Sequence, residues 1–193
     1  MTNDLPQGSA EWDALHPYAS LTPDAVLDAL ADIGLMGDGR LIALSSYENR
    51  VYQIQLETER APAQTDGTPV PESVVAKFYR PGRWTDAQIQ EEHDFAAELV
   101  AAEVPVVPPL NLQGRTLHHK SFVKGVNSSA AHKANLAEPQ KTVQGFSFSV
   151  SERRGGRRPE LDDDEVLEWI GRFLARIHTV GAAKAFHNRP SLS

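Results

Sequence analysis

A lysine and a glutamate on neighbouring predicted elements could form a pair in which the lysine contacts an anion. Lys77 lies within the run 73–79, where the other residues are mostly apolar. A lysine in such a strand costs desolvation free energy unless it is paired with an acid or contacts an anion. Glu91 and Glu92 lie in the next predicted helix and are the alternative carboxylate partners. The simpler interpretation is a lysine that reaches solvent at a sheet edge and glutamates on a solvated helix face.

The polar turn at 45–50 is the second group that could bind an anion. It consists of Ser45, Ser46, Tyr47, Glu48, Asn49 and Arg50. Serine hydroxyls and backbone N–H groups could donate to phosphate oxygens, and Arg50 could add positive charge. The turn has no glycine, unlike the common phosphate-binding loops. An ordinary hairpin turn therefore remains the alternative.

The elements that would position these groups follow from periodicity and turn signals. The runs 40–46 and 51–56 are predicted strands of a hairpin, and 73–79 is a third strand. Alternation places Val75, Lys77 and Tyr79 on one face and Val74, Ala76 and Phe78 on the other. A helix is expected from Thr85 to about residue 102, because Thr85 and Gln88 have the spacing of a capping box.

The remaining elements are predicted from caps and alternation. Thr22 and Pro23 open a helix that Gly34 ends. Short strands are expected at 110–112, 116–119 and 146–150, and residues 121–143 are interpreted as an insertion. Acidic residues at 162–164 begin a last helix with an apolar stripe that includes Trp169 and Phe173. No further element is expected after His178.

Composition limits the class of protein. The 193 residues carry a formal net charge of −7 and contain no cysteine, which argues against bulk nucleic-acid binding and excludes disulfides and thiolate metal sites. No apolar run approaches the length of a membrane span, and residues 1–10 do not have the pattern of a signal peptide. We therefore expect a soluble cytoplasmic protein without a membrane partner. The histidines show no metal-ligand spacing, so no metal site is predicted.

Several segments in one chain carry a resemblance to a known family. The most specific are Tyr47-Glu48-Asn49-Arg50 and Lys77-Phe78-Tyr79-Arg80-Pro81, supported by 83–85, 88–95, 103–106 and 171–178. With these segments the chain resembles the N-terminal part of the stress response kinase A family from about residue 22 onward. These are bacterial Ser/Thr protein kinases with the fold of aminoglycoside phosphotransferases and choline kinases.

The resemblance implies a role for each candidate residue. Lys77 would contact the α- and β-phosphates of ATP, Glu92 would pair with Lys77, and the 45–50 turn would lie over the phosphates. Ser151 and Glu152 would fall at the hinge that holds the adenine, although the family has a more apolar hinge there. The cofactors implied are ATP and Mg²⁺. The family's His-Gly-Asp loop and its metal-binding residues have no match in these residues, so no catalytic or metal-binding residue is expected in this chain.

The fold class expected is α+β: a kinase-like N-lobe with an antiparallel sheet of about five strands and one packed helix, then a linker and the first helix of a truncated C-lobe. The domain boundaries expected are a flexible tail at 1–20, the lobe at 21–150 with its 121–143 insertion, and the hinge and C-lobe start at 151–193.

Three functions follow in order of preference. The first is the N-terminal part of an ATP-dependent Ser/Thr protein kinase, inactive alone, whose partners are ATP, a protein substrate of the full-length kinase and a missing C-lobe. Without that lobe, exposed apolar surface around Trp169 would favour self-association. The second is a non-catalytic kinase-like binding or regulatory module. The third, a nucleic-acid adaptor using the four arginines within 153–158, is disfavoured because no aromatic residue lies among them.

Overall fold

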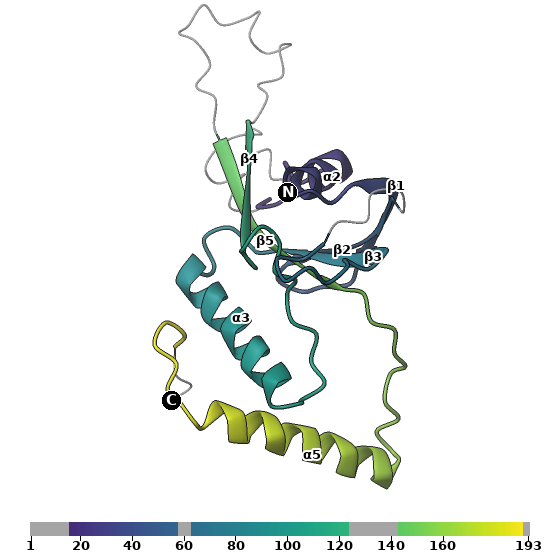
Figure 1. Cartoon of the computed structure of the whole chain (residues 1–193), viewed down its shortest axis with the longest axis vertical. Helices are drawn as coiled ribbons and strands as arrows, with labels where there is room; N and C mark the ends of the chain where they lie inside the picture. Colours follow the sequence, from purple (N-terminus) through teal and green to yellow (C-terminus); the bar gives the residue numbers. More distant parts are fainter. Residues whose placement is uncertain (1–15, 58–62, 124–142, 191–193) are drawn as a thin grey trace, which may run out of the picture.

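A single antiparallel sheet forms the centre of the structure (Figure 1). The computed structural model describes residues 16–57, 63–123 and 143–190. The five strands have the order β1-β2-β3-β5-β4. Their bounds are β1 Gly37–Leu44, β2 Arg50–Leu56, β3 Ser73–Phe78, β4 His118–Val123 and β5 Val143–Glu152. All neighbouring strands pair antiparallel, which confirms the predicted α+β class and the sheet of about five strands.

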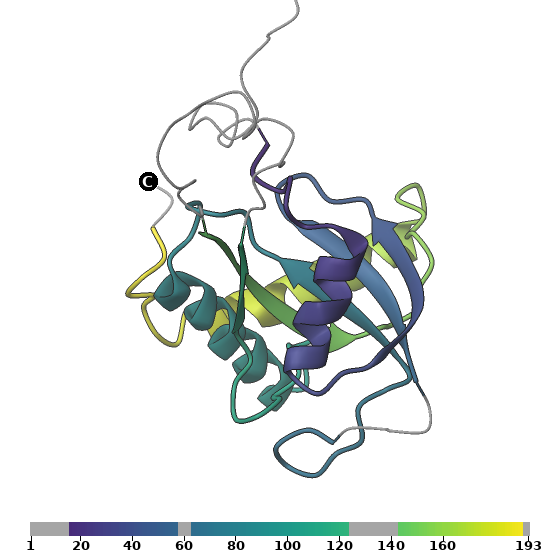
Figure 2. The same ribbon diagram turned by 90° about the horizontal axis from the view of Figure 1, so that it is seen from above.

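Helix α2 (Pro23–Asp32) covers one face of the sheet and closes the main core (Figure 2). Its N-cap is Thr22, whose side chain accepts a hydrogen bond from Ala25 N, as predicted. The fully buried Val26 and Leu30 belong to the same apolar cluster as the sheet residues Val74, Ala76, Phe78, Phe146, Phe148 and Val150. The face of β3 opposite Lys77 is therefore the buried face, as the alternation predicted.

Helix α3 (Asp86–Ala101) lies on the other side of the sheet and buries less apolar surface. It begins with the predicted capping box, in which Thr85 and Gln88 bond each other's backbone N–H. Ile89 packs with Tyr79 and Leu117 in a second, small cluster. Two helices rather than one thus pack on the sheet, and α2 covers the larger core.

Helix α5 (Asp164–Gly181) lies apart from the sheet, at the end of an extended connection from β5 (Figure 1). Asp163 is its N-cap, as the acidic cluster predicted. The guanidinium of Arg176 donates to the carbonyl oxygens of Ala102 and Glu103 at 3.0 and 2.8 Å, which ties α5 to the end of α3. Trp169 remains 61% exposed. Among the described helices, none is long and apolar enough to cross a membrane.

Three sequence-based boundaries need correction or comment. The predicted insertion at 121–143 was too long, because Ser121 pairs with Gly145 and Phe122 with Gln144 in the β4–β5 ladder; residues 124–142 lie outside the described residues. In place of the predicted strand at 110–112, the structure has one isolated bridge, between Leu112 and Arg115. Of the predicted tail at 1–20, residues 1–15 lie outside the described residues, whereas Tyr18 packs on the core and donates to Glu48 O at 2.7 Å.

Candidate functional site

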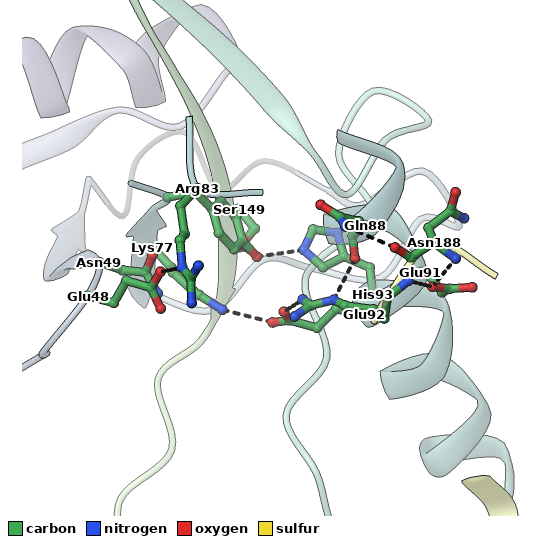
Figure 3. Close-up of polar contacts among 12 residues, drawn as sticks. Glu48, Asn49, Lys77, Arg83, Gln88, Glu91, Glu92, His93, Ser149 and Asn188 are labelled. Atoms are coloured by element: carbon green, nitrogen blue, oxygen red, sulfur yellow. Dashed lines mark hydrogen bonds and ion pairs between the residues drawn. The ribbon is translucent and has the colours of Figure 1, made fainter. Parts of the chain in front are cut away.

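Lys77 and Glu92 form an ion pair between the sheet and helix α3. Lys77 Nζ lies 2.8 Å from Glu92 Oε1, and their side chains point toward each other in Figure 3. The side chains are 32% and 40% exposed, so the pair borders solvent rather than the core. Lys77 is the last but one residue of β3 and Glu92 is near the middle of α3, so the pair fixes the helix against the end of the strand. Of the two glutamates considered from sequence, Glu92 is the partner of Lys77.

The sheet face around Lys77 carries an apolar floor that the sequence did not single out. Strand register places Leu44, Val51, Lys77 and Ser149 in one row and Ile42, Gln53, Val75 and Ser151 in the next. Directly opposed residues of an antiparallel sheet share a face. Ile42 is 58% and Leu44 is 38% exposed, although both are large apolar residues. The face opposite the core thus presents apolar side chains beside Lys77.

The 45–50 turn joins β1 to β2 at the end of this face. Tyr47 at its tip is fully exposed, and Glu48 Oε1 lies 2.6 Å from Arg83 Nε (Figure 3). Asn49 Oδ1 accepts from Arg80 N at 3.3 Å. The two contacts hold the turn against residues 80–83, where β3 leads into α3. Ser45 and Ser46 precede the tip, and Arg50 begins β2 with its guanidinium over the Tyr18 ring at 4.7 Å.

Ser151 and Glu152 end β5, and their side chains lie on opposite faces. Ser151 pairs with Val75 on the Lys77 face, whereas Glu152 pairs with Val74 of the core face and forms an ion pair with Arg154 at 2.7 Å. Only the backbone of Glu152 is therefore placed to contact a molecule that lies on the Lys77 face. The arginine-rich linker begins directly after this point, and its residues 153–158 are exposed.

A buried polar network around Tyr79 and His93 lies next to the Lys77–Glu92 pair. Tyr79 Oη is hydrogen-bonded to His93 Nε2 at 2.8 Å and lies 3.3 Å from Ser149 Oγ. His93 Nδ1 lies 2.9 Å from Thr116 Oγ1. Lys77 Nζ also lies 4.5 Å from the centre of the Tyr79 ring. Burial lowers the pKa of His93, which keeps the imidazole neutral, and burial raises the pKa of Tyr79.

The charge on Glu92 is set by its two cations. Burial alone would raise the pKa of the Glu92 carboxyl, but hydrogen bonds and positive charge from Lys77 and Arg189 outweigh burial and lower it. Glu92 is thus ionised at neutral pH and holds Lys77 in place. Arg189, which the sequence interpretation left out, contributes its guanidinium to Glu92 Oε2. Residues 182–190 were expected to form no element; in the structure they turn back and contact α3.

Comparisons with known proteins show the family of the chain. The sequence model of the phosphotransferase enzyme family matches residues 40–192. The chain belongs to this family. Serine/threonine protein kinase RdoA of Salmonella typhimurium is 38% identical over 180 residues, which cover 93% of this chain and 44% of that protein. Stress response kinase A of Escherichia coli K12 is 38% identical over 175 residues, 91% of this chain and 43% of that protein. The expected resemblance to the stress response kinase family is confirmed.

A solved phosphotransferase structure supports the fold. Amicoumacin kinase hAmiN, in complex with AMP-PNP, Ca²⁺ and Ami, superposes with a TM-score of 0.58 at 17% identity and covers 84% of this chain and 41% of that chain. At this identity the likeness shows the fold, a kinase-like lobe. The present chain spans less than half the length of the stress response kinases that it matches.

Proposed function

We propose that this chain binds ATP on the Lys77 face of its sheet and forms part of an ATP-dependent Ser/Thr protein kinase. The observation that carries the proposal is the Lys77–Glu92 ion pair beside an uncovered apolar floor. In protein kinases a strand lysine, fixed by a helix glutamate, holds the nucleotide phosphates. The family and the 38% identity to named Ser/Thr and stress response kinases support the same activity.

The proposal also gives the nucleotide a definite orientation on the sheet. Lys77 supplies the positive charge for phosphates, and the 45–50 turn lies at the same end of the sheet. In the next row of the sheet, two residues away from Lys77, Ile42 and Val75 provide apolar contacts suited to a purine. Ser151 of β5 lies in the same row. We therefore place the adenine near Ser151 and the backbone of Glu152, with the triphosphate extending toward Lys77.

The test is nucleotide binding by Lys77→Ala. Titration with a fluorescent ATP analogue and Mg²⁺ should show a loss of affinity of about tenfold or more, because a charge-assisted phosphate contact disappears. Lys120→Ala is the matched control: Lys120 pairs with Asp32 of α2, away from the Lys77 face. Equal affinities of Lys77→Ala and the unsubstituted chain would contradict the proposal.

Phosphoryl transfer itself is proposed for the full-length kinase. Mg²⁺ would accompany the ATP and neutralise its phosphates, a protein hydroxyl would accept the γ-phosphoryl group, and the cytoplasm would be the location. Because these 193 residues have no match to the His-Gly-Asp loop, we expect nucleotide binding without turnover from this chain. Measured ATP-dependent phosphorylation by the chain alone would contradict that expectation. Binding in a full-length protein that also lacks turnover would favour the alternative, a non-catalytic regulatory module.

Helix α5 provides the surface for the proposed self-association. Trp169, Leu174 and Leu167 are 61%, 50% and 46% exposed on this helix. Trp169 meets Phe173 edge to face and shares one side of the helix with Val166 and Ile170, and an exposed apolar helix face favours contact with another chain. We expect light scattering to show species heavier than 21.2 kDa for the isolated chain, and Trp169→Gln to shift the population toward the monomer. A strictly monomeric chain would argue for a self-sufficient module.

A further inference from the structure

The segment 184–190, which follows α5, packs along α3 through a series of side-chain and backbone contacts. Lys184 forms an ion pair with Glu98, and the rings of Phe186 and Phe95 meet edge to face at 5.2 Å between centroids. Gln88 Nε2 donates to Asn188 O at 2.9 Å. These contacts join residues about 90 to 100 positions apart in the chain. The segment therefore docks on the helix that carries Glu92.

Glu91 holds the end of this segment through its backbone. The Glu91 carboxylate accepts hydrogen bonds from the N–H groups of His187, Asn188 and Arg189 at 2.6, 3.0 and 2.8 Å. Three successive N–H groups that converge on one anion form a well-defined concave binding site for it. Figure 3 shows Asn188 beside Glu91 at one end of α3. The backbone at Arg189 is thus fixed independently of the Arg189 side chain.

The Arg189 side chain then reaches the same carboxylate that binds Lys77. Its Nε donates to Gln88 O at 3.0 Å, and its terminal nitrogen forms an ion pair with Glu92 Oε2. Lys77 uses the other oxygen, Glu92 Oε1, so both cations bind at once rather than in competition. Arg189 is 23% exposed, the least of the three side chains in this group.

The same arginine connects the pair to the turn at 45–50. Arg189 stacks on the Trp84 ring at 4.4 Å, and Arg83 stacks on the same ring at 4.8 Å. Arg83 in turn pairs with Glu48 of the turn. A planar guanidinium can stack on an indole and donate along its edge at the same time, which a lysine ammonium does not do.

We propose that Arg189 is a positioning residue for the Lys77–Glu92 pair, and that segment 184–190 thereby couples the region after α5 to the nucleotide face. By holding Glu92 Oε2, Arg189 restricts the rotamer of Glu92 so that Oε1 stays on Lys77. The proposal rests on the proposed nucleotide function for its consequence, but the placement of Glu92 itself can be measured without nucleotide. Arg189 is thus a third residue, from a distant part of the chain, that acts with the lysine–glutamate pair.

The experiment compares Arg189→Gln and Arg189→Lys with the unsubstituted chain. The first readout is the titration of the Glu92 carboxyl by carbon NMR, assigned with Glu92→Gln. Loss of Arg189 should raise the pKa of Glu92, because among the described residues Lys77 would then be the one cation left beside its carboxylate. Tyr79 and His93, which lie nearby, are uncharged. The second readout is the affinity for the fluorescent ATP analogue, which should fall at least about fivefold. As the pH is lowered, the variant should also lose affinity at a higher pH than the unsubstituted chain. Arg189→Lys should recover part of both effects.

Lys184→Gln is the matched control, since it removes an ion pair of the same segment that does not touch Glu92. It should leave both readouts unchanged, and circular dichroism should show that each variant is folded. An unchanged Glu92 titration in Arg189→Gln would overturn the positioning role, whether or not the chain binds nucleotide. If Lys77→Ala loses nucleotide while Arg189→Gln keeps it, the inference fails and the proposed function stands. If the unsubstituted chain binds no nucleotide, the proposed function fails, and the Glu92 titration alone decides the inference.

Discussion

Glu91 and Glu92 are adjacent on α3, yet their carboxylates bind different kinds of partner from different parts of the chain. Glu91 accepts three backbone N–H groups of the segment after α5, whereas Glu92 lies between the side chains of Lys77 and Arg189. Hydrogen bonds from the His187, Arg189 and Asn188 backbones lower the pKa of Glu91. One glutamate therefore anchors a segment, and its neighbour orders a cation on the sheet.

This difference predicts distinct effects of two alanine substitutions. In Glu91→Ala, the amides of residues 187–189 should exchange with deuterium at least about tenfold faster, because they lose a charged acceptor. Glu92→Ala should leave most of that protection and instead weaken nucleotide binding. Hydrogen exchange followed by mass spectrometry on the 184–190 peptide measures the first effect. Unchanged exchange in Glu91→Ala would show that the three bonds do not hold the segment.

Phe78 contacts three other aromatic rings of the main core. It is fully buried, stacks on Phe148 at 5.1 Å and meets Tyr52 and Phe146 edge to face. Phe78→Ala should lower the free energy of unfolding by about 3–5 kcal/mol, because it removes a large buried ring and leaves a cavity. Urea unfolding followed by circular dichroism measures this. The control is Tyr47→Ala at the exposed tip of the turn, which should change stability by less than about 0.5 kcal/mol.

The local features of the fold could be predicted from sequence because their signals lie within a few residues. Thr22 with Pro23 and Thr85 with Gln88 have the spacing of helix caps, and both caps are present. Alternation in 73–79 correctly assigned Lys77 and Phe78 to opposite faces. These patterns depend only on helix and strand periods, so no tertiary information was needed.

The features that sequence reasoning missed depend on contacts between distant residues. The segment 184–190 has no periodic pattern, and its docking uses backbone N–H groups, which every non-proline residue has. The start of β5 was missed because Gln144 and Gly145 lack the apolar alternation of a strand, and their pairing with β4 defines it. The exposed floor at Ile42 and Leu44 could be recognised only from strand register.

The capping box of α3 should contribute to the stability of the fold, and Thr85 and Gln88 should contribute different amounts. Thr85→Ala should lower the free energy of unfolding by about 1 kcal/mol, because Gln88 N loses its acceptor. Gln88→Ala should lower the free energy of unfolding by more than the loss of its capping hydrogen bond would, since Gln88 also donates to Asn188 O. Thermal and urea unfolding of the single and double variants measure the coupling. Thr179→Ala is the control, because the Thr179 hydroxyl donates to Ala175 O within α5 and caps no helix among the described residues. If Thr179→Ala lost as much stability as Thr85→Ala, the loss in Thr85→Ala could not be assigned to the cap.

His118 should make the folded chain sensitive to acid. Its side chain is 6% exposed and packs 5.5 Å from the Phe148 ring, and within the described residues its Nε2 has no hydrogen-bond partner. Burial, with smaller contributions from His119 and Arg115, lowers the pKa of His118 from 6.5 to about 4. Between these values the unfolded chain binds a proton that the folded chain does not bind. The stability contributed by neutral His118 is therefore complete above pH 6.5 and is lost as pH falls toward 4.

The expected loss across this window is on the order of 3 kcal/mol, the equivalent of the whole displacement in pKa. His93, whose pKa burial also lowers, adds to the loss in the same direction. Urea unfolding at a series of pH values should give a flatter profile for His118→Phe, because phenylalanine fills the same apolar site and takes up no proton. His178→Gln, which changes an exposed histidine of α5, should keep the original profile. If His118→Phe lost stability between pH 6.5 and 4 as steeply as the unsubstituted chain, the acid sensitivity would have to come from other groups.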